Sequence, residues 1–202
     1  MWHYWQRCAE LGLDVSFRPF FNRVRSDGAK RRFGEGDQAI REGDLIHSDW
    51  GIRYARLNSD HQQWAYVLRK GERQAPEGLR RLLDVFLAEF REGLSGNELL
   101  EAILARARAE GVPDPKVFSH SLGFLLHEPG PLIGLPREQQ RCPGRGDVVL
   151  RDNYAFTMEL SVADGVGEWD GQTVRLSIKE DVVFTTAGCR LIGGRQGAFY
   201  LI

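Results

Sequence analysis

The chain has 202 residues, 42% hydrophobic and 27% charged, which is the composition of a soluble globular protein. Its 27 lysines and arginines nearly balance its 28 aspartates and glutamates, so the charge argues against a nucleic-acid or membrane-surface partner held by bulk electrostatics. The length suits one domain, ordinary or two-lobed, and we expect residues 1–202 to form a single domain.

The spacing of the cysteines and the N-terminal residues indicate the cellular compartment of the protein. Cys8, Cys142 and Cys189 lie far apart and form no CxxC pair, a pattern that suits a reducing compartment better than a disulfide framework or a zinc ribbon. Residues 1–12 lack the apolar run of a secretion signal, and no stretch approaches eighteen apolar residues. These features predict a cytoplasmic protein.

The first part of the chain predicts one helix and two strands. Residues 2–11 are expected to form a helix that ends near Gly12, and the polar segment 26–41 is expected to be a loop. Strands are predicted over residues 44–57 and 63–69, because both segments are rich in β-branched and aromatic residues.

Two helices are predicted next. Pro76 stands where a first-turn proline belongs, and apolar residues recur at helical spacing over residues 79–90. Ser95 and Glu98 form a capping box for the second helix, which is expected to end at Gly111.

The rest of the chain, from residue 117 onward, is predicted to form mostly β-strands. Strands are predicted over residues 117–126, 154–162, 172–186 and 198–202, with a proline- and glycine-rich insertion over residues 130–146. Strands, two helices and then more strands indicate an α+β domain with its helices on one face of a mostly antiparallel sheet.

Four ionisable side chains stand in or beside these strands. Asp49 and Glu159 lie within apolar runs, where an ionised carboxylate is costly unless it is paired or bound to a cation. Taken singly, Asp60 fits a turn and His120 fits a hydrogen-bonded structural histidine. Taken together, oxygen ligands with one imidazole suit manganese, cobalt, iron or zinc in a hydrolytic site, often as a metal pair.

The order of four segments carries a resemblance to a known family. These are "DWGIRYARLNSD", "HSLGFLLHEPGP", "NYAFTMELSV" and "IKEDVVFTTAGC". From about residue 11 to its end, the chain resembles the pita-bread (M24) metallopeptidases, and is more similar to the Xaa-Pro aminopeptidase/dipeptidase branch than to the methionine aminopeptidases. The resemblance implies a curved, mostly antiparallel sheet with helices on its outer face and a metal site in its concave centre.

The resemblance also implies roles for individual residues. Asp49 would bind one of two divalent metal ions, Asp60 would bridge them, and His120 would be the single imidazole ligand. Glu159 would be both a ligand and the general base, and His127 would bind the substrate carbonyl and stabilise the tetrahedral intermediate. The alternative for His127 is a turn residue. Manganese is the expected metal, with cobalt, zinc or iron as alternatives.

At the position of the family's fifth metal ligand, this chain differs from the family pattern. The place of that ligand, in a strand of the form "IEDxVxxT", is taken by Lys179, and Glu180 comes one residue late. A β-bulge would bring Glu180 to the metal site as the fifth ligand; otherwise Lys179 points into the centre, where its ammonium replaces a cation or repels one. Strict alternation favours the second reading. Lys116 and the pair Gln62-Gln63 also replace residues typical of the family.

Three functions are compatible with these features. The first is a metal-dependent hydrolase that removes the N-terminal residue from short peptides, with proline second, as in the Xaa-Pro enzymes. The second, motivated by Lys179, is a pita-bread domain that has lost hydrolysis and serves as a binding module. The third is hydrolysis of small C–N compounds, as in creatinase-like relatives. None of the three involves a nucleic acid or a membrane.

The start of the chain carries a further expectation. The pita-bread fold normally has another helix before the one at residues 2–11, so we expect the C-terminal part of a longer protein or a shortened variant. A missing helix would leave apolar sheet surface uncovered, which favours a homodimer or a partner segment.

Overall fold

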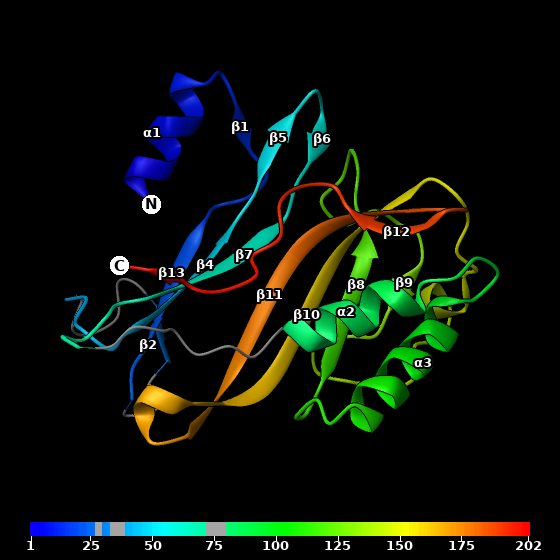
Figure 1. Cartoon of the computed structure of the whole chain (residues 1–202). Coiled ribbons are helices and arrows are strands. Elements are labelled where there is room, and N and C mark those ends of the chain that lie inside the picture. Colours follow the sequence, from blue (N-terminus) through cyan, green and yellow to red (C-terminus); the bar gives the residue numbers. More distant parts are fainter. Residues whose placement is uncertain (27–29, 33–38, 72–79) are drawn as a thin grey trace.

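The computed structural model describes residues 1–26, 30–32, 39–71 and 80–202. Its main feature is a ten-stranded, mostly antiparallel sheet that curves strongly (Figure 1). In pairing order, its central path is β3 (Lys30–Arg32), β2 (Phe20–Val24), β4 (Leu45–Trp50), β7 (His61–Tyr66), β11 (Gln172–Thr185), β10 (Tyr154–Val166), β8 (Lys116–Ser121) and β9 (Leu132–Ile133).

Two further strands join this sheet and three form a second, smaller one. β12 (Gly188–Leu191) pairs with β11, and β13 (Tyr200–Leu201) pairs in parallel with β7. The smaller sheet consists of β1 (Asp14–Val15), β5 (Ile52–Tyr54) and β6 (Leu57–Asn58). The α+β class with a mostly antiparallel sheet is therefore confirmed.

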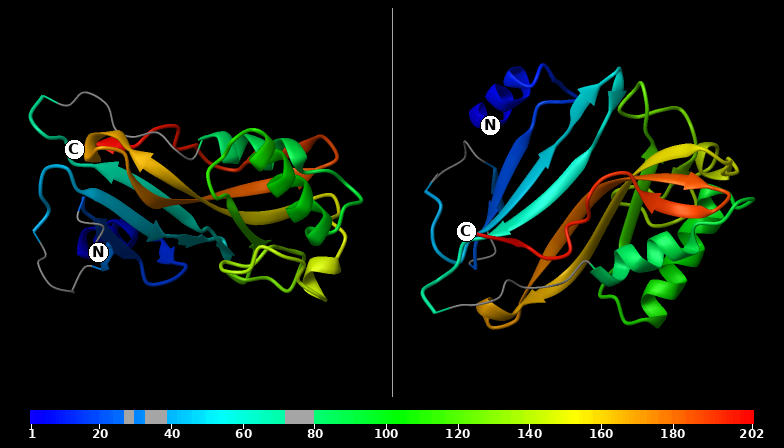
Figure 2. Two further views of the ribbon diagram at one scale, coloured as in Figure 1. Left: turned by 90° about the horizontal axis from the view of Figure 1, so that it is seen from below. Right: turned by 45° about the horizontal axis from the view of Figure 1, so that its top comes forward.

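Three α-helices lie among the described residues. α1 (Trp2–Glu10) lies beside β1, while α2 (Arg80–Glu89) and α3 (Gly96–Ala109) cover one face of the part of the sheet formed by β8 to β12 (Figures 1 and 2). Alternate residues of the central strands face these helices and form the hydrophobic core; on β10 they are Phe156, Met158, Leu160 and Val162. The intervening residues of the same strands point to the opposite face. No described helix combines the length and apolar character that a membrane span requires.

The capping box of α3 is confirmed. The Ser95 side chain accepts a hydrogen bond from the Glu98 backbone N–H, and the Glu98 carboxylate accepts one from the Ser95 N–H at 2.7 Å. The helix ends just before Gly111, which has φ +72°. The expected first-turn proline, Pro76, and the start of the apolar pattern at Leu79 lie outside the described residues.

Several predicted strands have different bounds. The segment 44–57 is divided at Gly51, where a Cβ atom would collide with the Ser59 carbonyl. The segment 117–126 is extended only to Ser121, because the chain then turns and the Glu128 carboxylate accepts a hydrogen bond from the Leu125 N–H. The expected loop 26–41 contains β3, and the insertion 130–146 contains β9.

Candidate functional site

Four polar side chains stand in one row across the middle of the large sheet. Directly opposed residues place Asp49 of β4 beside Gln62 of β7, Gln62 beside Lys179 of β11, and Lys179 beside Glu159 of β10. Because opposed residues of neighbouring strands point to the same face, these side chains meet on the face away from α2 and α3. Gln62 donates a hydrogen bond of 2.7 Å to Asp49 Oδ2.

Asp60 and His120 reach the same place from the neighbouring positions. Asp60 directly precedes β7, and His120 lies in β8, two residues from Phe118, which opposes Glu159. His120 Nε2 lies 3.3 Å from Glu159 Oε1 and 3.9 Å from Asp60 Oδ2. One ligand atom from each of these three side chains lies within 4.8 Å of the others. The structure thus brings together three of the expected metal ligands.

Lys179 occupies the middle of this group. Its Nζ lies 3.1 and 3.3 Å from the two oxygens of Asp60, 3.4 Å from Asp49 Oδ2 and 3.6 Å from Glu159 Oε2. Its side chain is only 12% exposed. The fourth expected ligand, Asp49, therefore contacts an ammonium group and the Gln62 amide.

Glu180 is not brought to this group. The pairing of β10 with β11 runs without interruption from Tyr154 opposite Phe184 to Val166 opposite Gln172, so the ladder contains no bulge. Glu180 consequently points to the helix-covered face, where its carboxylate accepts a hydrogen bond of 3.1 Å from the Gln196 N–H. The placement expected for a fifth ligand is corrected: strict alternation turns Lys179, and not Glu180, toward the centre.

The centre is short of positive charge. Burial raises the pKa of Asp60 to about 7 and raises the pKa of Asp49, and Lys179 offsets this only in part. Burial also works to lower the pKa of Lys179, but Glu159, Asp60 and Asp49 outweigh it, so the pKa of the lysine is raised. An additional cation would therefore stabilise the ionised carboxylates.

His127 lies beside this centre. Its ring centroid is 4.4 Å from that of His120, and burial together with the His120 ring lowers its pKa. The loop that follows β8 carries His127 and is attached to β6. The Asn58 side chain donates hydrogen bonds of 3.1 and 2.9 Å to the carbonyls of Gly123 and Phe124.

A second group of charged residues was not foreseen from the sequence. His61 stacks on Trp50 at 5.2 Å, and its two ring nitrogens lie 3.3 Å from Asp181 Oδ2 and 3.6 Å from Glu180 Oε2. Burial alone would lower the pKa of His61, but the two carboxylates raise it to about 10. Asp181 also accepts a hydrogen bond from the Asp60 N–H, so the Asp181 carboxylate, and not that of Glu180, holds the backbone of Asp60. The adjacent pairs Asp60-His61 and Glu180-Asp181 were the only sequence signal.

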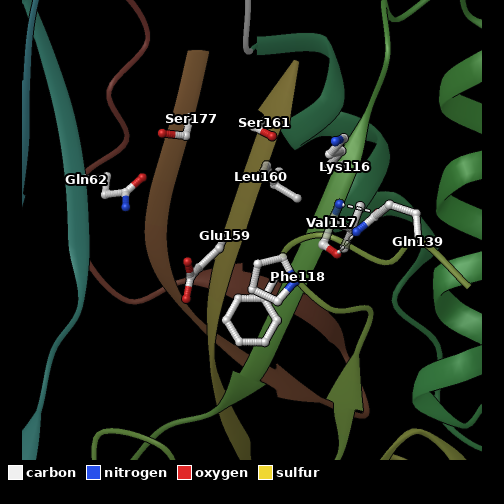
Figure 3. Close-up of a pocket in the computed structure, with 10 residues that line it drawn as sticks. Gln62, Lys116, Val117, Phe118, Gln139, Glu159, Leu160, Ser161 and Ser177 are labelled. Atoms are coloured by element: carbon white, nitrogen blue, oxygen red, sulfur yellow. Dashed lines mark hydrogen bonds between the residues drawn. The ribbon is translucent and has the colours of Figure 1, made fainter. Parts of the chain in front are cut away.

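A cavity of about 160 Å³ adjoins Glu159 (Figure 3). Its polar lining side chains come from four strands and the segment after β9: Gln62, Lys116, Gln139, Glu159, Ser161 and Ser177. Figure 3 shows the Glu159 carboxylate and the Gln62 amide on the same side of this space. Glu159 and Gln62 therefore belong both to the row of polar side chains and to the lining of this cavity.

The residues present fit a divalent cation. His120 is 1% exposed, and its Nε2 makes no hydrogen bond to any described residue although it faces two carboxylates. An unsatisfied buried nitrogen of this kind is costly unless something binds it. Two ligands that are each about 2.1 Å from one ion lie about 3.0 Å apart in octahedral geometry and about 3.4 Å apart in tetrahedral geometry, a range that includes the 3.3 Å between His120 Nε2 and Glu159 Oε1.

Comparison with known proteins agrees with this geometry. Residues 6–186 match the family described as metallopeptidase family M24. Among solved structures, the chain is similar to an X-Pro aminopeptidase from Thermotoga maritima (TM-score 0.65, 20% identity, 93% of this chain and 50% of that one) and to a prolidase from Thermococcus sibiricus (TM-score 0.65, 18% identity, 98% and 51%). It is also similar to the N-terminal domain of the FACT complex subunit SPT16 from chickpea (TM-score 0.60, 12% identity, 90% and 44%).

The similarity to these solved structures is limited in length and in sequence identity. The chain spans about half the length of these solved structures, and at such identities the similarity shows the fold alone. No curated protein matches the sequence significantly. The shared architecture is the curved sheet with its helices on the outer face.

Proposed function

Because the chain belongs to metallopeptidase family M24, we propose that it is a metal-dependent hydrolase that removes the N-terminal residue from short peptides with proline second. The observation that carries this proposal is the convergence of Asp60, His120 and Glu159 beside a cavity. A divalent ion bound by these three residues, manganese first with cobalt, zinc or iron as alternatives, supplies Lewis acidity and lowers the pKa of water.

Glu159 is suited to move the proton. Its side chain is 20% exposed, whereas those of Asp60 and His120 are 1% exposed, so among these three it is the carboxylate that water and substrate reach most readily. It also lines the cavity. We assign it the role of general base, which takes a proton from the attacking water and returns it to the leaving amine.

His127 is suited to hold the substrate carbonyl. Its lowered pKa keeps the imidazole neutral near pH 7, and a neutral imidazole retains one N–H donor. A donor aimed at a carbonyl oxygen stabilises the negative charge that develops there. The ring centroids of His127 and His120 lie 4.4 Å apart, which supports this role for His127.

The cavity supports a small substrate. Its volume of about 160 Å³ is close to the roughly 150 Å³ of an engineered cavity that holds one benzene ring, so one proline-sized group fits. Lys116 in its lining offers an ammonium to a free C-terminal carboxylate. These features favour a dipeptide of the Xaa-Pro type.

The direct test is hydrolysis of alanyl-proline. The purified chain, loaded with manganese, is expected to release alanine and proline, measured by chromatography, and to release less from the C-terminal amide of the same dipeptide. Absence of release by a chain that binds the metal contradicts the proposal. Hydrolysis of small C–N compounds without activity on dipeptides would indicate the creatinase-like alternative.

A second candidate function is a binding module without hydrolysis. The observation that favours it is the Lys179 ammonium within 3.6 Å of three carboxylates. The same fold occurs in a subunit of the FACT complex. This candidate predicts that the parent chain binds no divalent metal and that Lys179→Glu creates metal binding, as measured by calorimetry.

The cellular compartment and the oligomeric state of the chain are also part of this proposal. The three cysteines are free thiols, which supports a reducing, cytoplasmic location. We also propose that the chain forms a homodimer and that residues 1–202 act as one domain. Size-exclusion chromatography with light scattering and a single unfolding transition would check the two statements.

Asn58 provides a test of the role of His127. Asn58→Ala removes both side-chain hydrogen bonds to the loop that carries His127, at the Gly123 and Phe124 carbonyls. Because a misplaced group of this kind costs catalysis more than binding, we expect kcat to fall about 10-fold, with unchanged metal content. Asn153→Gly is the control, because it removes an exposed asparagine side chain at a turn where φ is +64° without forcing an alanine Cβ into the left-handed region. An unchanged kcat in Asn58→Ala would contradict the positioning role.

A further inference from the structure

We propose that the centre takes one divalent cation, bound by Asp60, His120 and Glu159, and that the Lys179 ammonium is a built-in positive charge in the place of a second ion. The inference rests on the metal centre of the proposed function. The family resemblance implies two ions, whereas this inference has one. Asp49 then forms an ion pair with Lys179 and does not bind a metal.

The carboxylates of Asp60 and Glu159 face two positions, one occupied by the Lys179 ammonium and one beside His120. Glu159 turns Oε2 toward Lys179 Nζ, at 3.6 Å, and Oε1 toward His120 Nε2, at 3.3 Å. Asp60 lies between the same two groups, with Oδ1 at 3.1 Å from Nζ and Oδ2 at 3.9 Å from Nε2. One position is therefore filled by an ammonium, and the other is bounded by two carboxylate oxygens and an imidazole nitrogen.

The charge balance admits one divalent ion. Counted as ionised, Asp49, Asp60 and Glu159 together with the Lys179 ammonium leave two negative charges, which a single divalent cation cancels. A second ion would give the buried centre an excess of positive charge and would lie directly beside the ammonium. Lys179→Glu would leave four negative charges in place of two, which two divalent cations cancel.

The lysine is held in place by its surroundings. Its strand position opposite Glu159 and Gln62 turns the side chain inward, and its Nζ lies 5.8 Å from the centre of the Phe17 ring. Asp49 completes the cage with Oδ2, which also accepts the Gln62 hydrogen bond. Withdrawal of the ammonium would leave two buried carboxylates, Asp49 and Asp60, and the partly exposed Glu159 without their shared partner.

The position near His120 has its own indication of a ligand. His120 Nε2 is buried, faces both carboxylates and has no hydrogen bond to a described residue. Its other ring nitrogen, Nδ1, lies 3.2 Å from the Ser121 carbonyl. If Nδ1 carries the proton, that contact orients Nε2 with its lone pair toward the two carboxylates, as in metal-binding histidines.

The test is the number of manganese ions bound by the 202-residue chain. After removal of metals with a chelator, calorimetric titration with manganese chloride and elemental analysis of the dialysed protein are expected to give one ion per chain. Lys179→Glu is expected to bind two. Lys179→Met, which keeps the length of the side chain but not its charge, is expected to keep one ion and to bind it about 10-fold more tightly, because the repulsion is gone.

Two further variants locate the ion. His120→Ala is expected to lose it, whereas Asp49→Asn is expected to keep one ion per chain, with folding of both verified by circular dichroism. Two ions in the parent, none in the parent, or loss of the ion in Asp49→Asn but not in His120→Ala would overturn the inference. A parent that binds one ion and hydrolyses no peptide would contradict the proposed function while leaving this inference intact.

Discussion

Glu159→Gln is expected to lower kcat for dipeptide hydrolysis by about 10³-fold, within the range found for removal of a general base. The amide keeps the size of the side chain, but it cannot take a proton from water. The residue lies 3.3 Å from His120 Nε2 and lines the cavity, so in the proposed mechanism its replacement acts on the attacking water. Steady-state kinetics at saturating manganese measure the effect.

Glu180→Gln is the matched control. The two glutamates have the same chemistry, but Glu180 faces the helix-covered side of the sheet, where it contacts the Gln196 N–H and His61. We expect its replacement to leave metal content and kcat unchanged and to lower the free energy of unfolding by about 1–2 kcal/mol, the cost of weakening buried hydrogen bonds to a charged group. An equal loss of activity in both variants would contradict the assignment.

Trp64→Ala is expected to lower the free energy of unfolding by about 3–5 kcal/mol, the usual cost of removing a large buried aromatic side chain. Trp64 is 1% exposed and packs between His47, at 4.6 Å, and Phe199, at 6.0 Å. Its indole N–H donates a hydrogen bond to the Ser177 carbonyl and so ties β7 to β11. Urea denaturation followed by circular dichroism gives the value.

Trp2→Ala makes the same chemical change on the surface. Trp2 is 82% exposed, so its removal opens no cavity in the core, and the free energy of unfolding is expected to change by less than about 0.5 kcal/mol. Similar losses in both variants would show that burial does not explain the effect of Trp64.

Local sequence patterns predicted much of the fold. The capping box at Ser95 and Glu98 depends on residues three apart, and the structure contains both of its hydrogen bonds. Alternation along residues 174–184 predicted which face of that strand is buried, and the structure agrees. Where the prediction was wrong, as at Gly51 and after Ser121, contacts with distant parts of the chain interrupt a segment whose composition suits a strand.

The candidate site was predictable only in part. Asp60, His120 and Glu159 were identified as polar residues in or beside apolar strands, and the structure places them together. The group formed by His61 with Glu180 and Asp181 was missed, because the adjacent pairs Asp60-His61 and Glu180-Asp181 were its only sequence signal, and neither pair shows that it contacts the other. The role of His61 depends on carboxylates about 120 residues away, which no local pattern reports.

By itself, the sequence favoured a strict alternation of inward and outward side chains, which sends Lys179 and Glu180 to opposite faces, and the uninterrupted ladder between β10 and β11 excluded the alternative of a bulge. Only the tertiary structure decided which groups surround the lysine. The register of four strands brings Asp49, Gln62 and Glu159 into its row. Register between strands distant in sequence is set by the packing of the whole sheet against its helices, and a single strand carries no information about its partner.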